Sequence, residues 1–219
     1  MKKKLITFLL AIIAIGANAQ CKYCNTYEDF LADRWQELDT IYCDSHSKDH
    51  RVRWDGNKYT LTTGDKNTDS ILKKNAFAVM MNNQLYVNCH NLRYNHDRFG
   101  NGYTKAVQIG QRSLLIVNDI NGRWHNNPSA VVGFGIGAAM LTSKNYCYVI
   151  SNGANDKGKI SARLIDDNMF EQMIASTNHY ELINEYYSVK ETEQRLQAKH
   201  VIPILEKAGL FSQYLKNQQ

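Results

Sequence analysis

Short runs of alternating apolar and polar residues predict β-strands through the middle of the chain. Residues that favour tight turns, such as Asn82-Asn83 and Gly110-Gln111, separate two pairs of these runs, and a longer Gly-, Asn- and Asp-rich segment separates a third pair. Each pair predicts a β-hairpin, and consecutive hairpins predict an antiparallel sheet of about six or seven strands, curled or sandwich-like. The expected strands are 59–63, 76–81, 84–88, 104–109, 113–118, 146–151 and 159–165.

An amphipathic helix is predicted before the strands, at residues 26–38. Asn25 or Thr26 can cap its first turn, and the acidic side chains of Glu28 and Asp29 suit the positive end of the helix dipole. Its apolar stripe would be formed by Phe30, Leu31, Trp35 and Leu38. The polar residues 43–58 are expected to form a loop.

The last part of the chain, residues 167–216, is predicted to be helical. Asp166 or Asp167 can cap a first helix, and a second would contain residues 182–187. A third is expected to begin near Glu191, to kink at Pro203 and to end at Gly209. Strands followed by helices, with residues 59–165 mainly β, indicate an α+β fold that forms a single domain over residues 20–219.

An apolar, Gly-rich insert at residues 129–141 interrupts the β region. It is too short to span a membrane, and a helix is favoured over a buried strand. Gly133 to Ala138 fit the spacing G-x-G-x-x-A, but no predicted strand comes directly before them. These glycines are therefore interpreted as packing residues, and no cofactor is predicted.

The first 19 residues have the pattern of a cleavable signal peptide. Three lysines precede an apolar run at residues 5–15, and Ala17 and Ala19 provide the small residues of a cleavage site. The mature chain would begin at Gln20, in the periplasm or outside the cell. Two alternatives remain: an uncleaved N-terminal anchor, and lipid attachment at Cys21.

Removal of residues 1–19 changes the charge of the chain. The full sequence has 26 basic and 21 acidic residues, and the removed segment contains three lysines and no acids, which leaves 23 against 21. No basic cluster of the kind that binds nucleic acid remains. We therefore expect no nucleic-acid partner, and no transmembrane span in the mature chain.

Five cysteines are present, and export would bring them into an oxidising compartment. A Cys24–Cys43 disulfide is the preferred pairing, because it would tie the first helix to the loop after it. Cys21 and Cys24 also form a CxxC motif, for which a thiol-redox role is the alternative. Cys43, His46 and His50 have a spacing that could contribute to a metal site, although no metal site is predicted.

The segment 88–103 combines polar and aromatic side chains at high density. Such side chains can line a glycan or peptide site, whereas the simpler interpretation is a polar loop between two hairpins. No GxSxG, HExxH or Walker A motif occurs in the chain, and no catalytic residue is predicted. The candidate binding residues are His90, Arg93, Tyr94, His96, Asp97, Arg98 and Tyr103.

Three parts of the sequence resemble a group of secreted Bacteroidetes proteins of unknown function. They are the hairpin segment AFAVMMNNQLYVNCHNLRY, the Gly-rich insert, and the run YVIS…ARLIDDNMFEQMI with the tyrosine-rich helices after it. The resemblance implies a periplasmic or surface location and a fold of strands and helices. It implies no active site.

The sequence therefore favours an exported cell-envelope protein that binds an unknown ligand or protein partner without catalysis. One alternative is a hydrolase that acts on envelope glycan or peptide through the 88–103 loop. The other is a thiol-redox or metal-handling protein that uses Cys21, Cys24 and Cys43.

Overall fold

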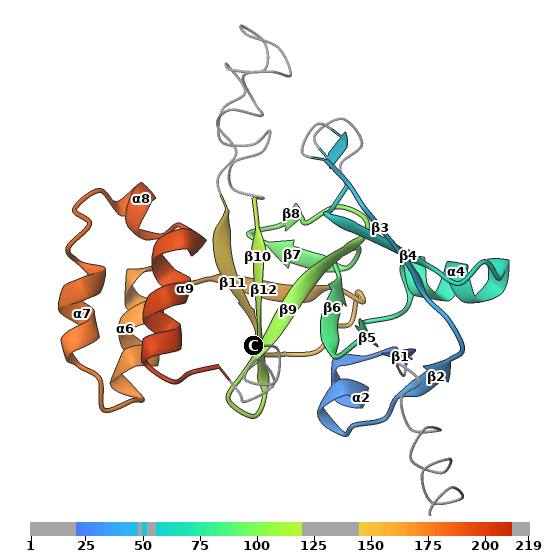
Figure 1. The fold of residues 1–219 in the computed structure, drawn as a ribbon, viewed down its shortest axis with the longest axis horizontal. Helices are drawn as coiled ribbons and strands as arrows, with labels where there is room; N and C mark the ends of the chain where they lie inside the picture. The colour runs from blue at the N-terminus through green and yellow to red at the C-terminus, as the bar shows by residue number, and fades with distance from the viewer. Residues whose placement is uncertain (1–20, 48–49, 52–55, 120–144, 212–219) are drawn as a thin grey trace, which may run out of the picture.

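The computed structural model describes residues 21–47, 50–51, 56–119 and 145–211, which form an α+β fold (Figure 1). The predicted α+β class with a mostly antiparallel sheet is confirmed, but the sheet has twelve strands rather than the six or seven expected. All the expected strands are present: β4 (Tyr59–Thr62), β5 (Ala78–Met81), β6 (Gln84–Asn88), β9 (Tyr103–Ile109), β10 (Ser113–Asn118), β11 (Tyr146–Ile150) and β12 (Ile160–Leu164). Five short strands were not predicted: β1 (Cys21–Cys24), β2 (Gln36–Leu38), β3 (Tyr42–Ser45), β7 (Leu92–Tyr94) and β8 (Asp97–Arg98).

The sheet bends back on itself. Its order is β2-β1-β5-β6-β9-β10-β11-β12-β7-β8, with β3 and β4 attached beside β9. β6 ends at Asn88 and β7 begins at Leu92. That connection can reach about 14 Å, whereas five strand spacings in a flat sheet would separate β6 from β7 by about 24 Å. The sheet must therefore curve to bring β7 alongside β12, where the two strands pair in parallel.

The inner face of the bend holds the largest hydrophobic cluster. Its members alternate with outward-facing residues along the strands, as a two-residue period requires. Short helix α2 (Tyr27–Leu31) covers part of this face, with Tyr27 buried against Phe77 in an edge-to-face contact at 5.8 Å. Members from the central strands include Leu85, Val87, Ala106, Leu114, Ile116, Tyr148 and Ile150.

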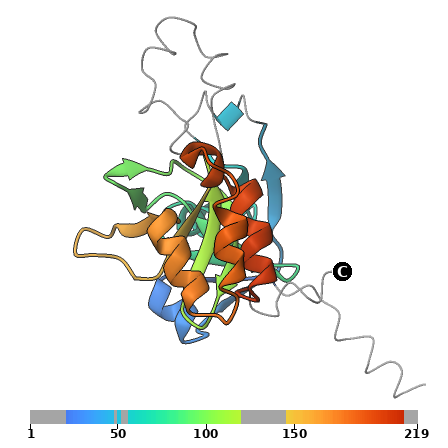
Figure 2. The ribbon, with the colours of Figure 1, turned by 90° about the vertical axis from the view of Figure 1, so that its left-hand side faces the viewer.

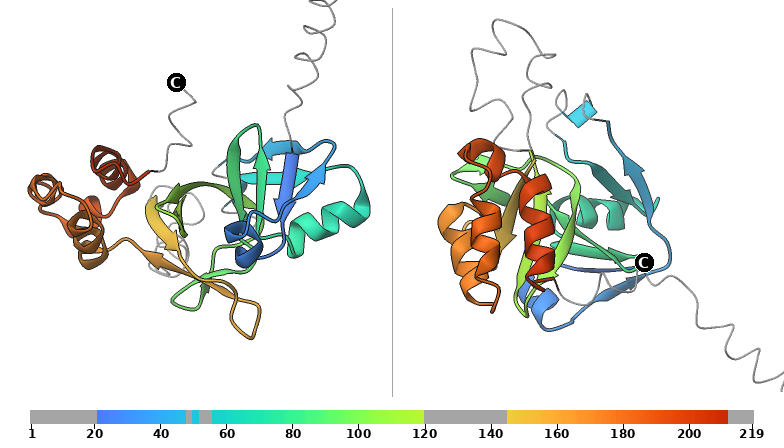
Figure 3. Two further views of the ribbon diagram at one scale, coloured as in Figure 1. Left: turned by 90° about the horizontal axis from the view of Figure 1, so that it is seen from below. Right: turned by 60° about the vertical axis from the view of Figure 1, so that its left-hand side comes forward.

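Two separate layers cover the outer face of the sheet. Helices α6 (Asp167–Ala175), α7 (Glu181–Tyr186), α8 (Thr192–Arg195) and α9 (Ala198–Lys207) pack over β10 and β11. Helix α4 (Lys66–Lys74) and the β3–β4 hairpin pack over β1, β5 and β6. Figure 1 and the left view of Figure 3 show the C-terminal helices and α4 at opposite ends of the molecule.

The two short hairpin turns occur at the predicted positions, and the first has the predicted length. Asn82 and Asn83 have φ angles of 51° and 57°, which are the positive values that a tight hairpin turn between paired strands needs. The β9–β10 turn differs in length, because Ile109 pairs with Ser113 and leaves three residues in the loop. Gly110 supplies its positive φ of 58°.

The predicted helix 26–38 is wrong in its second half. Thr26 does cap the helix by accepting a hydrogen bond from the Asp29 amide, but α2 ends at Leu31. Asp33 has a φ of 52°, a conformation that stops a right-handed helix. The chain then reverses, and residues 36–38 form β2 against β1.

The polar loop expected at residues 43–58 is also partly wrong. Residues 42–45 form β3, which pairs with the predicted strand β4.

Helix α4 was not predicted, because Ile71 and Leu72 are its only large apolar residues. Leu72 is nevertheless fully buried, so the surrounding sheet rather than a sequence repeat stabilises this helix.

The C-terminal helices agree with the prediction except at one break. Asp166 caps α6, and Gly209, at a φ of 68°, follows the end of α9. Helix α9 continues through Pro203, the residue at which a kink was predicted. The third helix is divided at Gln197 instead, because Gln197 is extended and forms a β-bridge with Tyr146.

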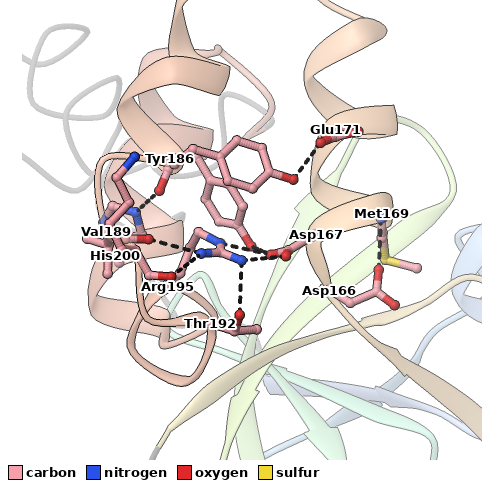
Figure 4. A network of polar contacts seen from close by, with 11 residues as sticks. Asp166, Asp167, Met169, Glu171, Tyr186, Val189, Thr192, Arg195 and His200 are labelled. Atoms are coloured by element: carbon pink, nitrogen blue, oxygen red, sulfur yellow. Dashed lines mark hydrogen bonds and ion pairs between the residues drawn. The ribbon is translucent and has the colours of Figure 1, made fainter.

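A buried arginine joins these helices (Figure 4). The guanidinium of Arg195 donates to both carboxylate oxygens of Asp167, at 2.5 and 3.0 Å, and to the carbonyls of Val189 and Lys190. Tyr186 donates to the same carboxylate at 2.7 Å and stacks on Phe170 at 3.8 Å. The network therefore connects the start of α6 to α7 and α8.

Several predictions concern residues outside the described ranges. They are the signal peptide 1–19, the Gly-rich insert 129–141 and the helical residues 212–216. Within the ranges that are described, no helix has the length and apolar character needed to cross a membrane.

Candidate functional site

An open groove lies on the inner face of the sheet, beside α2. Its floor is a row of cross-strand neighbours, in which Lys22 faces Met80, Met80 faces Leu85, and Leu85 faces Ala106. Neighbours in such a row point to the same face of a sheet. Four strands that are not all adjacent in sequence therefore combine to give one largely apolar surface.

The wall of the groove comes from α2 and the reversal after it. Phe30 and Leu31 occupy the last turn of the helix, and the positive φ of Asp33 brings Trp35 back toward Phe30. The Phe30 and Trp35 rings meet edge-to-face at 6.1 Å. Helix α2 is held in place by the Tyr27 hydroxyl, which donates to the Arg112 carbonyl in the β9–β10 turn.

Polar side chains surround the apolar surface. The Lys22 ammonium lies 5.0 Å from the Trp35 ring, and the Trp35 indole N–H donates to Asp33 Oδ1 at 2.7 Å. These contacts fix the orientation of the indole and leave it only partly buried. The remaining polar lining comes from the β5–β6 and β9–β10 hairpins: Asn83, Gln84, Gln108 and Gln111.

The size and composition of the groove define what it can hold. Its volume is about 250 Å³, which is below the roughly 300–1,000 Å³ of pockets that enclose a drug-sized ligand. Of the described residues that line it, only Lys22 and Asp33 are ionisable. The arrangement suits the binding of one compact apolar or aromatic group, with its polar part at the rim.

The structure separates the candidate residues of the 88–103 segment. Tyr103 is buried and donates to the Leu72 carbonyl at 2.6 Å, so it belongs to the core. Tyr94 packs its ring against Tyr148 at 5.3 Å, and His90 Nδ1 lies 2.9 Å from Asn101 Oδ1.

The remaining four candidates lie on the small β7–β8 hairpin: Arg93, His96, Asp97 and Arg98. This hairpin extends one edge of the sheet, where β7 pairs with β12 and β8 pairs with β7. It contributes no residue to the groove.

The five cysteines form no disulfide, since no two sulfurs are at bonding distance. The preferred Cys24–Cys43 pairing is therefore not present. Cys24 belongs to the inner cluster and Cys43 packs against the outer cluster beside α4, so the sheet lies between them. The expectation failed because residues 21–24 form a strand whose side chains alternate between the two faces.

Two of the candidate cysteines lie in surroundings that disfavour the thiolate. Burial raises the pKa of the Cys24 thiol to about 12, which favours the protonated thiol over the reactive thiolate. Burial also raises the pKa of Cys43. His46 and His50 stack at 4.3 Å, and no cluster of three potential metal ligands occurs among the residues that the structure describes.

The groove was only partly predictable from the sequence. Phe30, Leu31 and Trp35 belong to the predicted apolar stripe, although the stripe was assigned to one continuous helix. Lys22, Met80 and Leu85 could not be recognised as floor residues, because their proximity depends on the register of three strands.

The fold and the groove define an α+β protein with an open groove walled by aromatic side chains. The chain belongs to a protein family described as Family of unknown function (DUF6563), whose model matches residues 22–212. No curated protein and no solved structure matches the chain significantly.

Proposed function

We propose that this protein is an exported, non-catalytic binding protein of the cell envelope. The groove would hold one apolar or aromatic group, either a side chain of a partner protein or the hydrophobic part of a small molecule. The observation that carries this proposal is the half-buried Trp35–Phe30 wall above the apolar floor of Met80, Leu85 and Ala106.

The physical chemistry of the groove supports binding. Aromatic rings contribute a large apolar surface with little conformational freedom to lose, and the Trp35 ring is already fixed by Lys22 and Asp33. A preorganised surface of this kind loses less entropy when a ligand binds. With Lys22 and Asp33 as the only ionisable groups in its described lining, the groove offers no obvious nucleophile with an adjacent base.

Titration with anilinonaphthalene sulfonate, an aromatic fluorescent probe, tests the proposal. The protein produced from its full-length gene should bind the probe with saturable fluorescence, and Trp35→Ala should weaken binding about tenfold, equivalent to roughly 1.4 kcal/mol. Tyr180→Ala is the matched control, because Tyr180 is an exposed aromatic residue that does not line the groove. Circular dichroism should show that both variants are folded.

A second variant tests the floor independently of the wall. Leu85→Gln replaces an apolar floor residue by a polar one of similar length, and it should also weaken probe binding. Equal affinity of the wild type, Trp35→Ala and Leu85→Gln would contradict the assignment of the groove.

A further inference from the structure

The outer face of one sheet edge carries a dense group of basic side chains. On β12, Ile160 and Ala162 point into the core, so Ser161 and Arg163 point outward. Ser161 pairs with Arg93 on β7, and Arg93 pairs with Arg98 on β8. Cross-strand partners share a face, which places these arginines on one surface.

Two adjoining hollows follow this surface. The first, of about 640 Å³, is lined by Arg93 and by Lys157 and Lys159 from the β11–β12 turn. The second, of about 440 Å³, is lined by Arg163 and the start of α6. Asn95 and Ser161 line both hollows, so the two lie next to each other. Figure 2 shows the β7–β8 hairpin and the β11–β12 turn on the same side of the molecule.

Neutral groups hold two of these basic side chains in position. Arg93 donates to the carbonyls of His90 and Leu92, at 3.0 and 2.7 Å, and Lys159 donates to Asn91 Oδ1 at 3.1 Å. In the part of the chain that the structure describes, no carboxylate lies within ion-pair distance of four basic residues on this face: Arg93, Lys157, Lys159 and Arg163.

The positive charges on this face also oppose one another. Like charges directly opposite on neighbouring strands are destabilising, and Arg93 faces Arg98. Burial and the nearby Arg98 lower the pKa of Arg93. An anion bound between these strands would relieve the repulsion. Asp156 and Asp166 are the only acidic residues among the described lining of the two hollows.

We propose that this face binds an acidic polysaccharide, through the carboxylate or sulfate groups of an extended strand. Lys159 directly precedes β12, and Arg163 lies on β12 four residues further along the chain, so their side chains can meet anionic groups about 13 Å apart. One small anion cannot span that distance, whereas a chain of acidic sugars can.

The uncharged residues on this face favour sugar over nucleic acid. Asn95, Asn155 and Ser161 offer donors and acceptors for hydroxyl groups. Single-stranded nucleic acid would need exposed aromatic rings for base stacking. Among the described residues that line the surface, Tyr94 is the only Phe, Tyr or Trp, and its ring packs edge-to-face against buried Tyr148; the imidazole of His96 is the one other ring.

Binding to immobilised polygalacturonate and to a sulfated glycosaminoglycan tests the proposal, with neutral dextran as the uncharged polymer. The protein from its full-length gene should bind at least one acidic polymer at low salt and lose it at about 1 M salt, where the Debye length is about 3 Å. The double variant Lys157→Gln/Lys159→Gln should weaken binding roughly fivefold or more.

A matched double variant gives the control. Lys73→Gln/Lys74→Gln removes the same charge from exposed residues of α4, outside both hollows, and should bind as the wild type does. Arg163→Gln should weaken binding in the second hollow. Trp35→Ala should leave polysaccharide binding unchanged, which separates this site from the aromatic groove.

Three results would overturn the proposal. They are no binding to either acidic polysaccharide at low salt, equal weakening by both lysine pairs, and tighter binding to polyglutamate or single-stranded DNA than to the acidic polysaccharides. The second result would indicate attraction by overall charge alone, and the third would assign the face to a different class of partner.

Discussion

At the scale of single residues, Arg195 joins helix α8 to helix α6 and to the segment before α8 through several hydrogen bonds. Its side chain is 7 % exposed, and it pairs with Asp167 and with two backbone carbonyls. By contrast, Arg34 is 65 % exposed and pairs with Asp29 alone. The two arginines should therefore differ strongly in their contribution to stability.

We expect Arg195→Ala to lower the free energy of unfolding by about 3 kcal/mol, because the change removes a buried guanidinium that bonds a partly exposed carboxylate and two backbone carbonyls. The matched change Arg34→Ala should cost less than about 1 kcal/mol, as exposed pairs do. Urea denaturation followed by circular dichroism measures both. Equal effects of the two changes would contradict the structural role of Arg195.

The same network predicts a pH dependence. The Arg195 hydrogen bonds hold the pKa of Asp167 below its ordinary value of about 3.9, so the folded state favours the ionised carboxylate. The resulting stabilisation is present above the unfolded pKa and is lost as the pH falls through the folded pKa. Asp167→Asn should flatten the fall in stability on acidification below about pH 4. The linkage would be contradicted if the free energies of unfolding of the wild type and of Asp167→Asn fell by the same amount as the pH is lowered through this range.

At the scale of elements, the sequence predicted the hairpins correctly but not the end of the first helix, which stops at Leu31 rather than at residue 38. Asn82 and Asn83 encode their turn locally, through the positive φ angles that asparagine tolerates. Residues 36–38 have no local signal that outweighs the apolar spacing of Phe30, Leu31 and Trp35, and they become a strand because β1 offers a partner. Strands of two to four residues depend on tertiary pairing, which explains why five of them were missed.

The turn gives a direct test at this scale. Asn83 has a φ of 57°, where glycine avoids the steric cost of a Cβ atom. Asn83→Gly should stabilise the protein by about 0.5 kcal/mol, and Asn83→Val should destabilise it by more than about 1 kcal/mol. Thermal unfolding measures both variants. A stabilising valine would show that the turn geometry is different.

At the scale of the whole molecule, the bend of the sheet creates the groove and the basic face. The sequence predicted the hairpins and that the sheet is curled or sandwich-like, but not how β7 returns to pair with β12. That pairing brings Arg93 to Ser161, which are 68 positions apart in the chain. No local pattern specifies such a contact, so the sequence identified Arg93 and Arg98 as candidate binding residues but could not show that Lys159 and Arg163 share their face. Tyr103 is the opposite case. The polar segment 88–103 suggested that Tyr103 is a binding residue, whereas the fold buries its side chain.

Export of the chain is a prediction that concerns the whole molecule. Cys21 is buried and pairs with Leu38, so a lipid on its sulfur would require the thiol to leave the core. We therefore expect release at Gln20 rather than lipidation. Intact mass spectrometry of the protein from a periplasmic or culture fraction should give the mass of residues 20–219. A mass that contains residues 1–19, or a diacylglycerol adduct, would contradict this expectation.

The central claim is that the Trp35 groove binds a compact apolar or aromatic group. Fluorine NMR of the protein labelled with fluorotryptophan tests it most directly, because the chain has three tryptophans and Trp35→Phe assigns the Trp35 signal. Titration with indole, p-cresol and cyclohexanol should shift the Trp35 signal in a saturable manner and leave the other two unchanged. A Trp35 signal that responds to none of these probes, or no more than the other tryptophans do, would contradict the account.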